Sequence, residues 1–234
     1  MATDSAGGAA AGVAMGGEAV TVTTYFTVTT PRSWFELELR PDRRDTAIRD
    51  LVGARVRETP ELWRYRGEIV RTLRRYARNA WQSGARYAGA FVTPAEDTTV
   101  TGCLTVTAVP PPPGAGDASE RVIERLIATS TGPRRSGDEA TWSSVVVVDI
   151  PRLGRCPRSY GVEDVRLPDD TGVVRVVTMQ TFVRAPDGGM LLVSASSPDL
   201  DLAEELFELF DAVTATIRVG QAPAAVPAPA EATP

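Results

Sequence analysis

The sequence predicts an α+β fold in which a largely antiparallel sheet is flanked by helices, as in an α/β/α sandwich. Three observations lead to this prediction. Strand-like runs come mainly in pairs joined by short turn sequences, and strands joined in this way are antiparallel. Helical patterns lie between these pairs rather than after every strand. The 234 residues are 43% hydrophobic and 24% charged, which is enough to bury a sizeable core.

The folded part is expected to begin with a β-hairpin. Residues 21–30 alternate β-branched and aromatic side chains and stop at a proline, which indicates a strand. Residues 34–39 place Phe35, Leu37 and Leu39 on one face of a second strand. The short turn between the two runs favours their pairing.

Two helices are expected next. From Asp45 onward, apolar residues recur with helical spacing. A second helix is predicted from Pro60 to about Ser83, because Thr59 suits the N-cap and proline suits the first helical position. Gly84 is a typical residue at the end of a helix.

The middle of the chain predicts a second hairpin, formed by residues 86–93 and 98–109 around the turn 94–97. The run Pro110–Pro113 ends the sheet pairing and forms a loop, although it could also serve as a ligand for a proline-binding groove. Residues 119–129 predict a short amphipathic helix.

Residues 141–150 contain four consecutive valines and predict a strand that is buried on both faces. Residues 151–172 are interpreted as irregular, with one short edge strand near 162–167. Residues 172–185 and 190–196 then form a third hairpin, whose turn has the sequence Pro-Asp-Gly-Gly.

The domain prediction has three parts. Residues 1–19 are a flexible Gly/Ala-rich tail, residues 20–219 form a single α+β domain, and residues 220–234 are a flexible Pro/Ala-rich tail. Cys103 and Cys156 have no CxxC spacing, so they are expected to be ordinary thiols of a reducing compartment, and whether they pair is left open.

Composition argues against most enzyme classes. All 25 basic residues are arginine, and the chain contains neither lysine nor histidine. Schiff-base lysines, Ser-His-Asp and Cys-His units, and histidine-ligated metals are therefore excluded. We expect no enzymatic activity, no cofactor and no metal. The formal charge of −5 argues against nucleic acid. Without a basic signal region or an 18-residue apolar run, the expectation is a cytoplasmic protein with no membrane span.

The predicted helix over residues 60–84 is the main candidate binding surface. It carries six arginines against two glutamates. The partner-binding candidates among them are Arg64, Arg71, Arg74, Arg75 and Arg78. Their guanidinium groups could pair with the carboxylates of another protein, whereas the plainer interpretation is a solvated face whose side-chain stems cover apolar neighbours.

The final predicted helix, over residues 199–218, has the opposite charge. Its carboxylates suit the helix dipole, which is the plain explanation. They are Asp199, Asp201, Glu204, Glu205, Glu208 and Asp211. The alternative is that they complement the arginine-rich helix, either within one molecule or across a homodimer.

Two weaker features complete the candidates. The acidic residues near 163–170 could form an acid–base pair or a cation site, but adjacent aspartates point to different sides of an extended chain. The four tryptophans, Trp34, Trp63, Trp81 and Trp142, are expected to pack in the core or between helix and sheet.

Three segments resemble a known family. They are YFTVTTPRSWFELEL, RVVTMQTFVRAPDGGMLLVSASSP and ELFDAVTATIRV, and they lie within residues 21–39 and 173–219. Together they look like the PsbP/Mog-like sandwich superfamily, which includes actinobacterial LpqN-type proteins. The resemblance implies a non-catalytic accessory or protein-binding module.

The predicted function is therefore that of a non-enzymatic accessory or adaptor protein that binds another protein, or a second copy of itself, through the arginine-rich helix. A small-ligand binder or enzyme that uses the acidic residues near 163–170 is the first alternative. An assembly subunit is the second.

Overall fold

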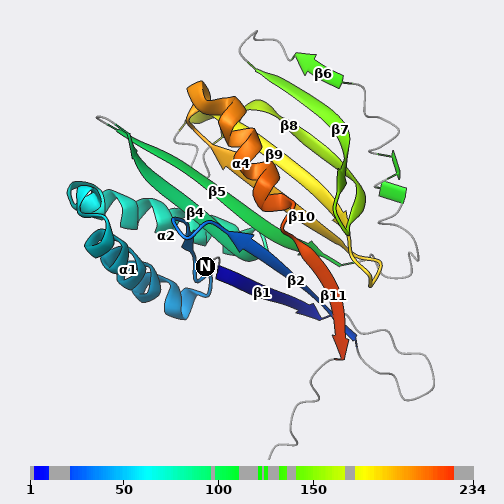
Figure 1. Ribbon diagram of the computed structural model, residues 1–234, viewed down its shortest axis with the longest axis horizontal. Coiled ribbons are helices and arrows are strands. Elements are labelled where there is room, and N and C mark those ends of the chain that lie inside the picture. Colours follow the sequence, from blue (N-terminus) through cyan, green and yellow to red (C-terminus); the bar gives the residue numbers. More distant parts are fainter. Residues whose placement is uncertain are drawn as a thin grey trace, which may run out of the picture.

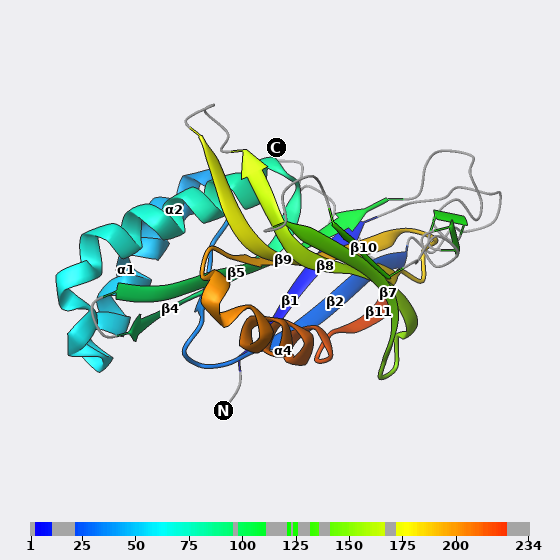
Figure 2. The same cartoon turned by 90° about the horizontal axis from the view of Figure 1, so that it is seen from above.

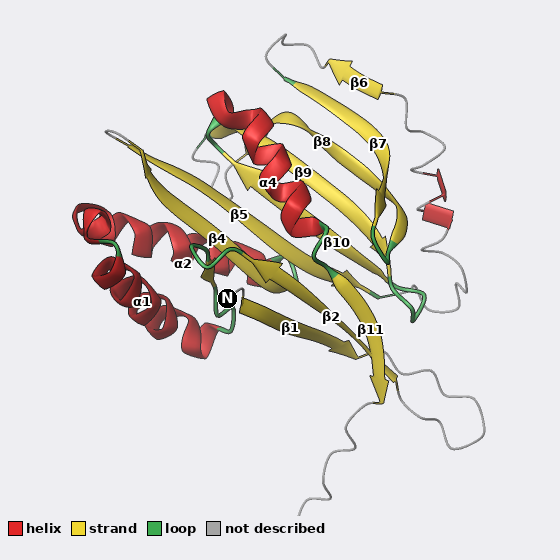
Figure 3. Ribbon diagram, in the orientation of Figure 1, coloured by secondary structure: helices red, strands yellow, loops and turns green. Residues whose placement is uncertain are grey.

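The computed structural model describes residues 3–10, 22–95, 98–110, 121–122, 124–125, 132–135, 141–166 and 172–223. The predicted fold class is confirmed, because helices flank a large antiparallel sheet (Figure 1). A second, smaller sheet lies beside it, and Figure 3 distinguishes the helices from both sheets by colour.

The large sheet has eight strands in the order β3-β4-β5-β10-β9-β8-β7-β6, and each strand is antiparallel to its neighbours. The strands are β3 (Phe35–Glu36), β4 (Ala85–Ala95), β5 (Thr98–Val109), β6 (Gly132–Arg135), β7 (Trp142–Ile150), β8 (Gly154–Arg166), β9 (Val173–Arg184) and β10 (Met190–Ser197). The predicted hairpins correspond to β4–β5 and β9–β10. Gly188, with a φ of 80°, forms the turn of the second hairpin, which suits a residue without a side chain.

The small sheet has the order β1-β2-β11, where the strands are β1 (Thr3–Ala10), β2 (Val22–Thr30) and β11 (Arg218–Pro223). The predicted hairpin of residues 21–30 with 34–39 is wrong, because β2 pairs with β1 and β11 while β3 pairs with β4. β1 lies in the range assigned to the first tail, and β11 extends into the range assigned to the second. The β-branched strand β2 offers backbone hydrogen-bonding groups on both edges, and both ends of the chain pair with it.

The helices differ from their predicted bounds. They are α1 (Pro41–Glu58), the 3₁₀ helix η1 (Pro60–Tyr65), α2 (Arg66–Gln82), the 3₁₀ helix η2 (Leu200–Leu202) and α4 (Ala203–Thr214). α1 begins four residues earlier than predicted, because a proline occupies its first position and Asp42 follows in the first turn. Of the predicted helix over 119–129, only residues 121–122 and 124–125 are described, and they are helical.

The predicted helix over 199–218 ends early and turns into strand. Thr216 lies in the turn after α4, where its hydroxyl oxygen accepts from the backbone N–H of Thr29 at 2.9 Å. Its single hydroxyl hydrogen is shared between the backbone carbonyl of Val213 at 2.7 Å and that of Thr29 at 3.1 Å. These bonds hold the chain beside β2, so the following residues continue as β11 rather than as helix.

The helices cover opposite faces of the large sheet (Figure 2). Ala88, Ala90 and Val92 of β4 pack against α1 and α2, whereas Tyr87 and Phe91 of the same strand belong to the core beneath α4 and the small sheet. This alternation follows from the two-residue period of a strand. The fold therefore has two apolar cores, one on each side of the large sheet.

The interpretation of residues 151–172 as irregular is wrong, since most of them form β8, a long strand between β7 and β9. The three prolines of this segment, Pro151, Pro157 and Pro168, suggested interruption, yet Pro157 lies within the ladder opposite Val147. Gly161 explains the close pairing with β7, because a Cβ at this position would overlap the carbonyl oxygen of Trp142.

Candidate binding surface: the basic helical layer

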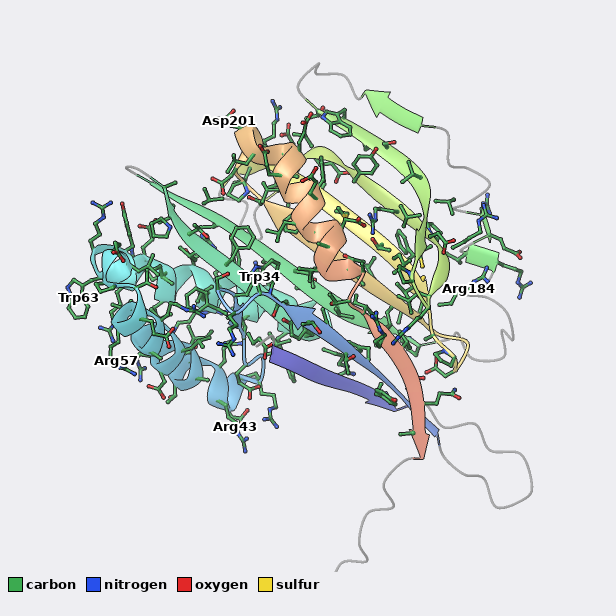
Figure 4. The ribbon with its side chains drawn as sticks, in the orientation of Figure 1. Trp34, Arg43, Arg57, Trp63, Arg184 and Asp201 are labelled. Atoms are coloured by element: carbon green, nitrogen blue, oxygen red, sulfur yellow. The ribbon has the colours of Figure 1, made fainter. Side chains whose placement is uncertain are left out.

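The segment from α1 to α2 forms a basic layer on one face of the molecule. Its three helices carry eleven arginines and six carboxylates, a net charge of +5 in a chain whose formal charge is −5. Figure 4 shows Arg43, Arg57 and Trp63 pointing outward from this layer. The charge of the molecule is therefore strongly segregated.

α2 is amphipathic. Its buried side consists of Ile69, Leu73, Ala77 and Ala80, which pack toward the sheet and α1. On the opposite side lie Arg71, Arg75 and Arg78, spaced by four and then three residues, and all three are exposed. Residues with this spacing lie on one helix face.

We call Arg71, Arg75 and Arg78 the arginine stripe. Within the described part of the chain, their guanidinium groups make no hydrogen bond or ion pair. The five donors of each guanidinium are thus available to planar acceptors such as carboxylates, which can bind in the bidentate manner. The structure brings these three predicted residues together.

The other two predicted residues lie differently. Arg74 points toward α1, where its Nη2 donates to the backbone carbonyl of Asp45 at 3.0 Å and its Nε lies 3.6 Å from the Asp45 carboxylate. Arg64 belongs to η1, and its guanidinium lies 4.7 Å from the centre of the Tyr65 ring. Arg74 therefore joins the two helices, and Arg64 lies outside the arginine stripe.

Trp63 is a surface residue that sequence reasoning missed. Its side chain is 66% exposed on η1, with the guanidinium of Arg66 at 5.9 Å from its ring. The prediction that it packs internally is wrong, as it is for Trp81, which is 41% exposed. The sequence did indicate this exposure, because Leu62 and Tyr65 lie on the apolar side of the predicted helix and Trp63, between them, does not. Trp and Arg are the residues most enriched in binding hot spots.

The prediction of internal packing is right for the other two tryptophans. Trp34 is buried and its ring centre lies 5.2 Å from that of Phe91. Trp142 makes edge contacts with Tyr160 and Phe207, which links β7 to α4.

α4, which carries most of the carboxylates of the predicted final helix, lies on the opposite face of the large sheet from α2 (Figure 2). The hypothesis that the two helices complement each other within one molecule is therefore wrong. Asp201, Glu204, Glu205 and Glu208 are exposed and make no ion pair with the described residues. Asp199 instead has a structural role, because its carboxylate accepts from the backbone N–H of Thr101 at 2.8 Å.

Asp211 has a partner inside the protein. It accepts a hydrogen bond from Nη1 of Arg158, a β8 residue that is 5% exposed. The Nε of Arg158 donates to the hydroxyl of Thr181 at 3.0 Å, while its Nη2 has no hydrogen-bond partner. This charged pair joins α4 to the sheet.

The alternative acidic site is only partly described, since Asp169 and Asp170 lie outside the described residues. Asp164 forms a two-point ion pair with Arg175, at 2.7 and 3.0 Å. The hydrogen bonds from Arg175 hold the pKa of the Asp164 carboxyl below its ordinary value. Glu163 beside it is exposed. An acid catalyst needs the opposite shift, so this geometry does not favour acid–base chemistry at Asp164.

One buried and one half-buried titratable group were not anticipated. Burial raises the pKa of Tyr87 to about 12, and it also raises the pKa of Glu36 above its ordinary value. The Tyr87 hydroxyl lies 3.4 Å from that of Thr30, and Oε1 of Glu36 has no hydrogen-bond partner. The alternating pattern of residues 34–39 placed Glu36 on the polar face, where no burial was expected.

Among the described residues, no three side chains of the metal-binding types lie close enough together to hold an ion. None of the described helices is both long and apolar enough to span a bilayer.

Comparison with known proteins gives little for this chain. No protein-family model matches it, and no curated protein matches it. Among solved structures, it is similar to the crystal structure of LpqN of Mycobacterium tuberculosis, a protein described as involved in cell envelope biogenesis. The identity is 9% and the TM-score 0.41, over 92% of this chain and 91% of LpqN. A similarity at this level carries no argument about function.

Proposed function

We propose that this protein is a non-catalytic accessory or adaptor protein that binds an acidic surface of another protein through the basic helical layer. The observation that carries the proposal is the arginine stripe, three adjacent guanidinium groups that no described residue of the chain engages. The sequence resembles the PsbP/Mog-like superfamily. The accessory role in this proposal is taken from that resemblance.

Energetics favour a protein over a highly charged polymer as the partner. A single exposed ion pair contributes about 0–1 kcal/mol, so three of them set orientation and encounter rate more than affinity. Trp63 on the same layer could add apolar contact area, and burial of a tryptophan commonly provides the larger energy in an interface. The carboxylates on the opposite face would oppose the wrapping of a long nucleic acid around the molecule.

The test is affinity capture from extracts of cells that make the protein, with the wild type compared with Arg71→Glu/Arg75→Glu/Arg78→Glu. The matched control is Arg86→Glu/Arg152→Glu/Arg155→Glu, which makes the same charge change at exposed positions outside the basic layer. We expect the control to retain the wild-type partners and the stripe variant to lose them. Recovery of the same proteins by all three would overturn the proposal.

A further inference from the structure

The face opposite the basic layer carries its own unengaged charge. The segment from η2 through α4 contains five carboxylates and no basic residue. Four of them are exposed and make no ion pair with the described residues, and we call these four the acidic stripe: Asp201, Glu204, Glu205 and Glu208. Figure 4 shows Asp201 pointing away from the molecule at the first turn of this segment.

The two stripes are opposite in charge and similar in length. The arginine stripe carries three positive charges, and the acidic stripe carries four negative charges. Arg78 lies seven positions after Arg71, and Glu208 lies seven positions after Asp201. Seven helical steps extend about 10 Å, so the arginine stripe covers about 10 Å, and the acidic stripe, which begins in the 3₁₀ helix η2, covers a similar distance.

We propose that the protein binds a second copy of itself head to tail, with the arginine stripe of one molecule against the acidic stripe of the next. The inference rests on the proposed function and names the acidic partner. Both stripes lie on the same chain, so they are present at equal concentration wherever the protein is. Contact between the two stripes needs no other molecule.

The arrangement of the stripes determines the symmetry. In a two-fold dimer, the two molecules use the same surface patch, so that patch must contain both the arginine stripe and the acidic stripe. The two stripes lie on opposite faces of the sheet (Figure 2), so a single two-fold interface does not bring both together. Head-to-tail contacts leave one free stripe at each end, so the molecules form rows that lengthen with concentration, or rings where the rotation between neighbours closes.

Salt should control this association. The screening length is about 10 Å at 0.1 M salt, so facing stripes attract each other while more distant charges are screened. It falls to about 3 Å at 1 M salt, where exposed ion pairs contribute little. We expect the average mass of the wild type in sedimentation equilibrium to rise from micromolar to millimolar protein at the lower salt, and to stay monomeric at the higher.

Two variants provide the decisive experiment: Arg71→Gln/Arg75→Gln/Arg78→Gln and Asp201→Asn/Glu204→Gln/Glu205→Gln/Glu208→Gln. Glutamine has a helix propensity close to that of arginine and glutamate, so both variants are expected to fold, which circular dichroism checks. Each variant alone lacks one stripe and should stay monomeric. An equimolar mixture retains one intact contact and should give a dimer that does not lengthen further.

A wild type that stays monomeric at low salt would overturn the inference, as would a closed two-fold dimer or a mixture of variants that stays monomeric. The proposed function is distinguishable from it. If the wild type does not self-associate but the stripe variant still loses its partners in affinity capture, the adaptor proposal stands and only the head-to-tail contact fails.

Discussion

At the scale of single residues, Arg158 shows how a buried charge is tolerated. Asp211→Ala should lower the free energy of unfolding by about 1–3 kcal/mol, because it leaves a buried guanidinium without its carboxylate. Arg158→Met/Asp211→Ala should recover part of this loss, since the buried charge is gone. Urea denaturation measures both. Glu208→Ala on the same helix is the control, with an expected change within about 0.5 kcal/mol. An equal change in Asp211→Ala would contradict the structural role of the pair.

Glu36 leads to a prediction about pH. Because burial raises the pKa of Glu36 in the folded protein above its unfolded value, folding favours the protonated carboxyl. The stability of the wild type relative to Glu36→Gln should therefore fall as the pH rises through the folded pKa. Glu36→Gln should be the more stable protein near pH 7, and its advantage should disappear near pH 4. Denaturation at both pH values checks this, and a constant difference would contradict it.

The sequence predicted single residues well where their environment depends on one element alone. Exposure of the arginine stripe follows from the apolar positions Ile69 and Leu73 on the other side of the same helix. Arg158 and Glu36 could not be predicted in this way, because their burial depends on what another part of the chain places over them.

At the scale of elements, α2 is not optimised for its own stability. Arg75 lies one turn from both Arg71 and Arg78, and like charges at these spacings repel. Arg75→Glu should therefore raise the free energy of unfolding by about 0.5 kcal/mol, since two repulsive pairs become attractive. Arg49→Glu on α1 should have the opposite effect, because it places a carboxylate four residues after Asp45. Thermal denaturation compares the two, and a loss of stability in Arg75→Glu would contradict the proposed free state of the stripe.

Element types were mostly predictable and element partners were not. The hairpins β4–β5 and β9–β10 follow from local turn chemistry. β2 reads correctly as a strand, yet its partners β1 and β11 are at the two ends of the chain, which no local turn indicates. β8 was missed because the prolines in and around it were taken as interruptions, and its pairing depends on β7 and β9, which lie on either side of it.

At the scale of the whole molecule, the sequence predicted the α+β class but not the assignment of helices to faces. The face that a helix covers depends on the paths of its connections, and hydrophobic spacing carries no information about it. The proposed function depends on which face each helix covers. If α2 and α4 lay on the same face, their charges would neutralise each other within one molecule.

The two cysteines provide a final consequence of the layered fold. Cys103 lies on β5 and Cys156 on β8, and β10 and β9 separate them in the sheet, too far apart for a disulfide. Cys156 is buried and Cys103 is half-buried, and burial raises the pKa of both thiols, so both should react slowly with alkylating reagents while their layer is closed. Cys103 lies against the layer of α1 and α2, whereas Cys156 belongs to the core beneath α4. The time course of alkylation at each site, read by peptide mass spectrometry, would therefore show which layer opens first, without an engineered label.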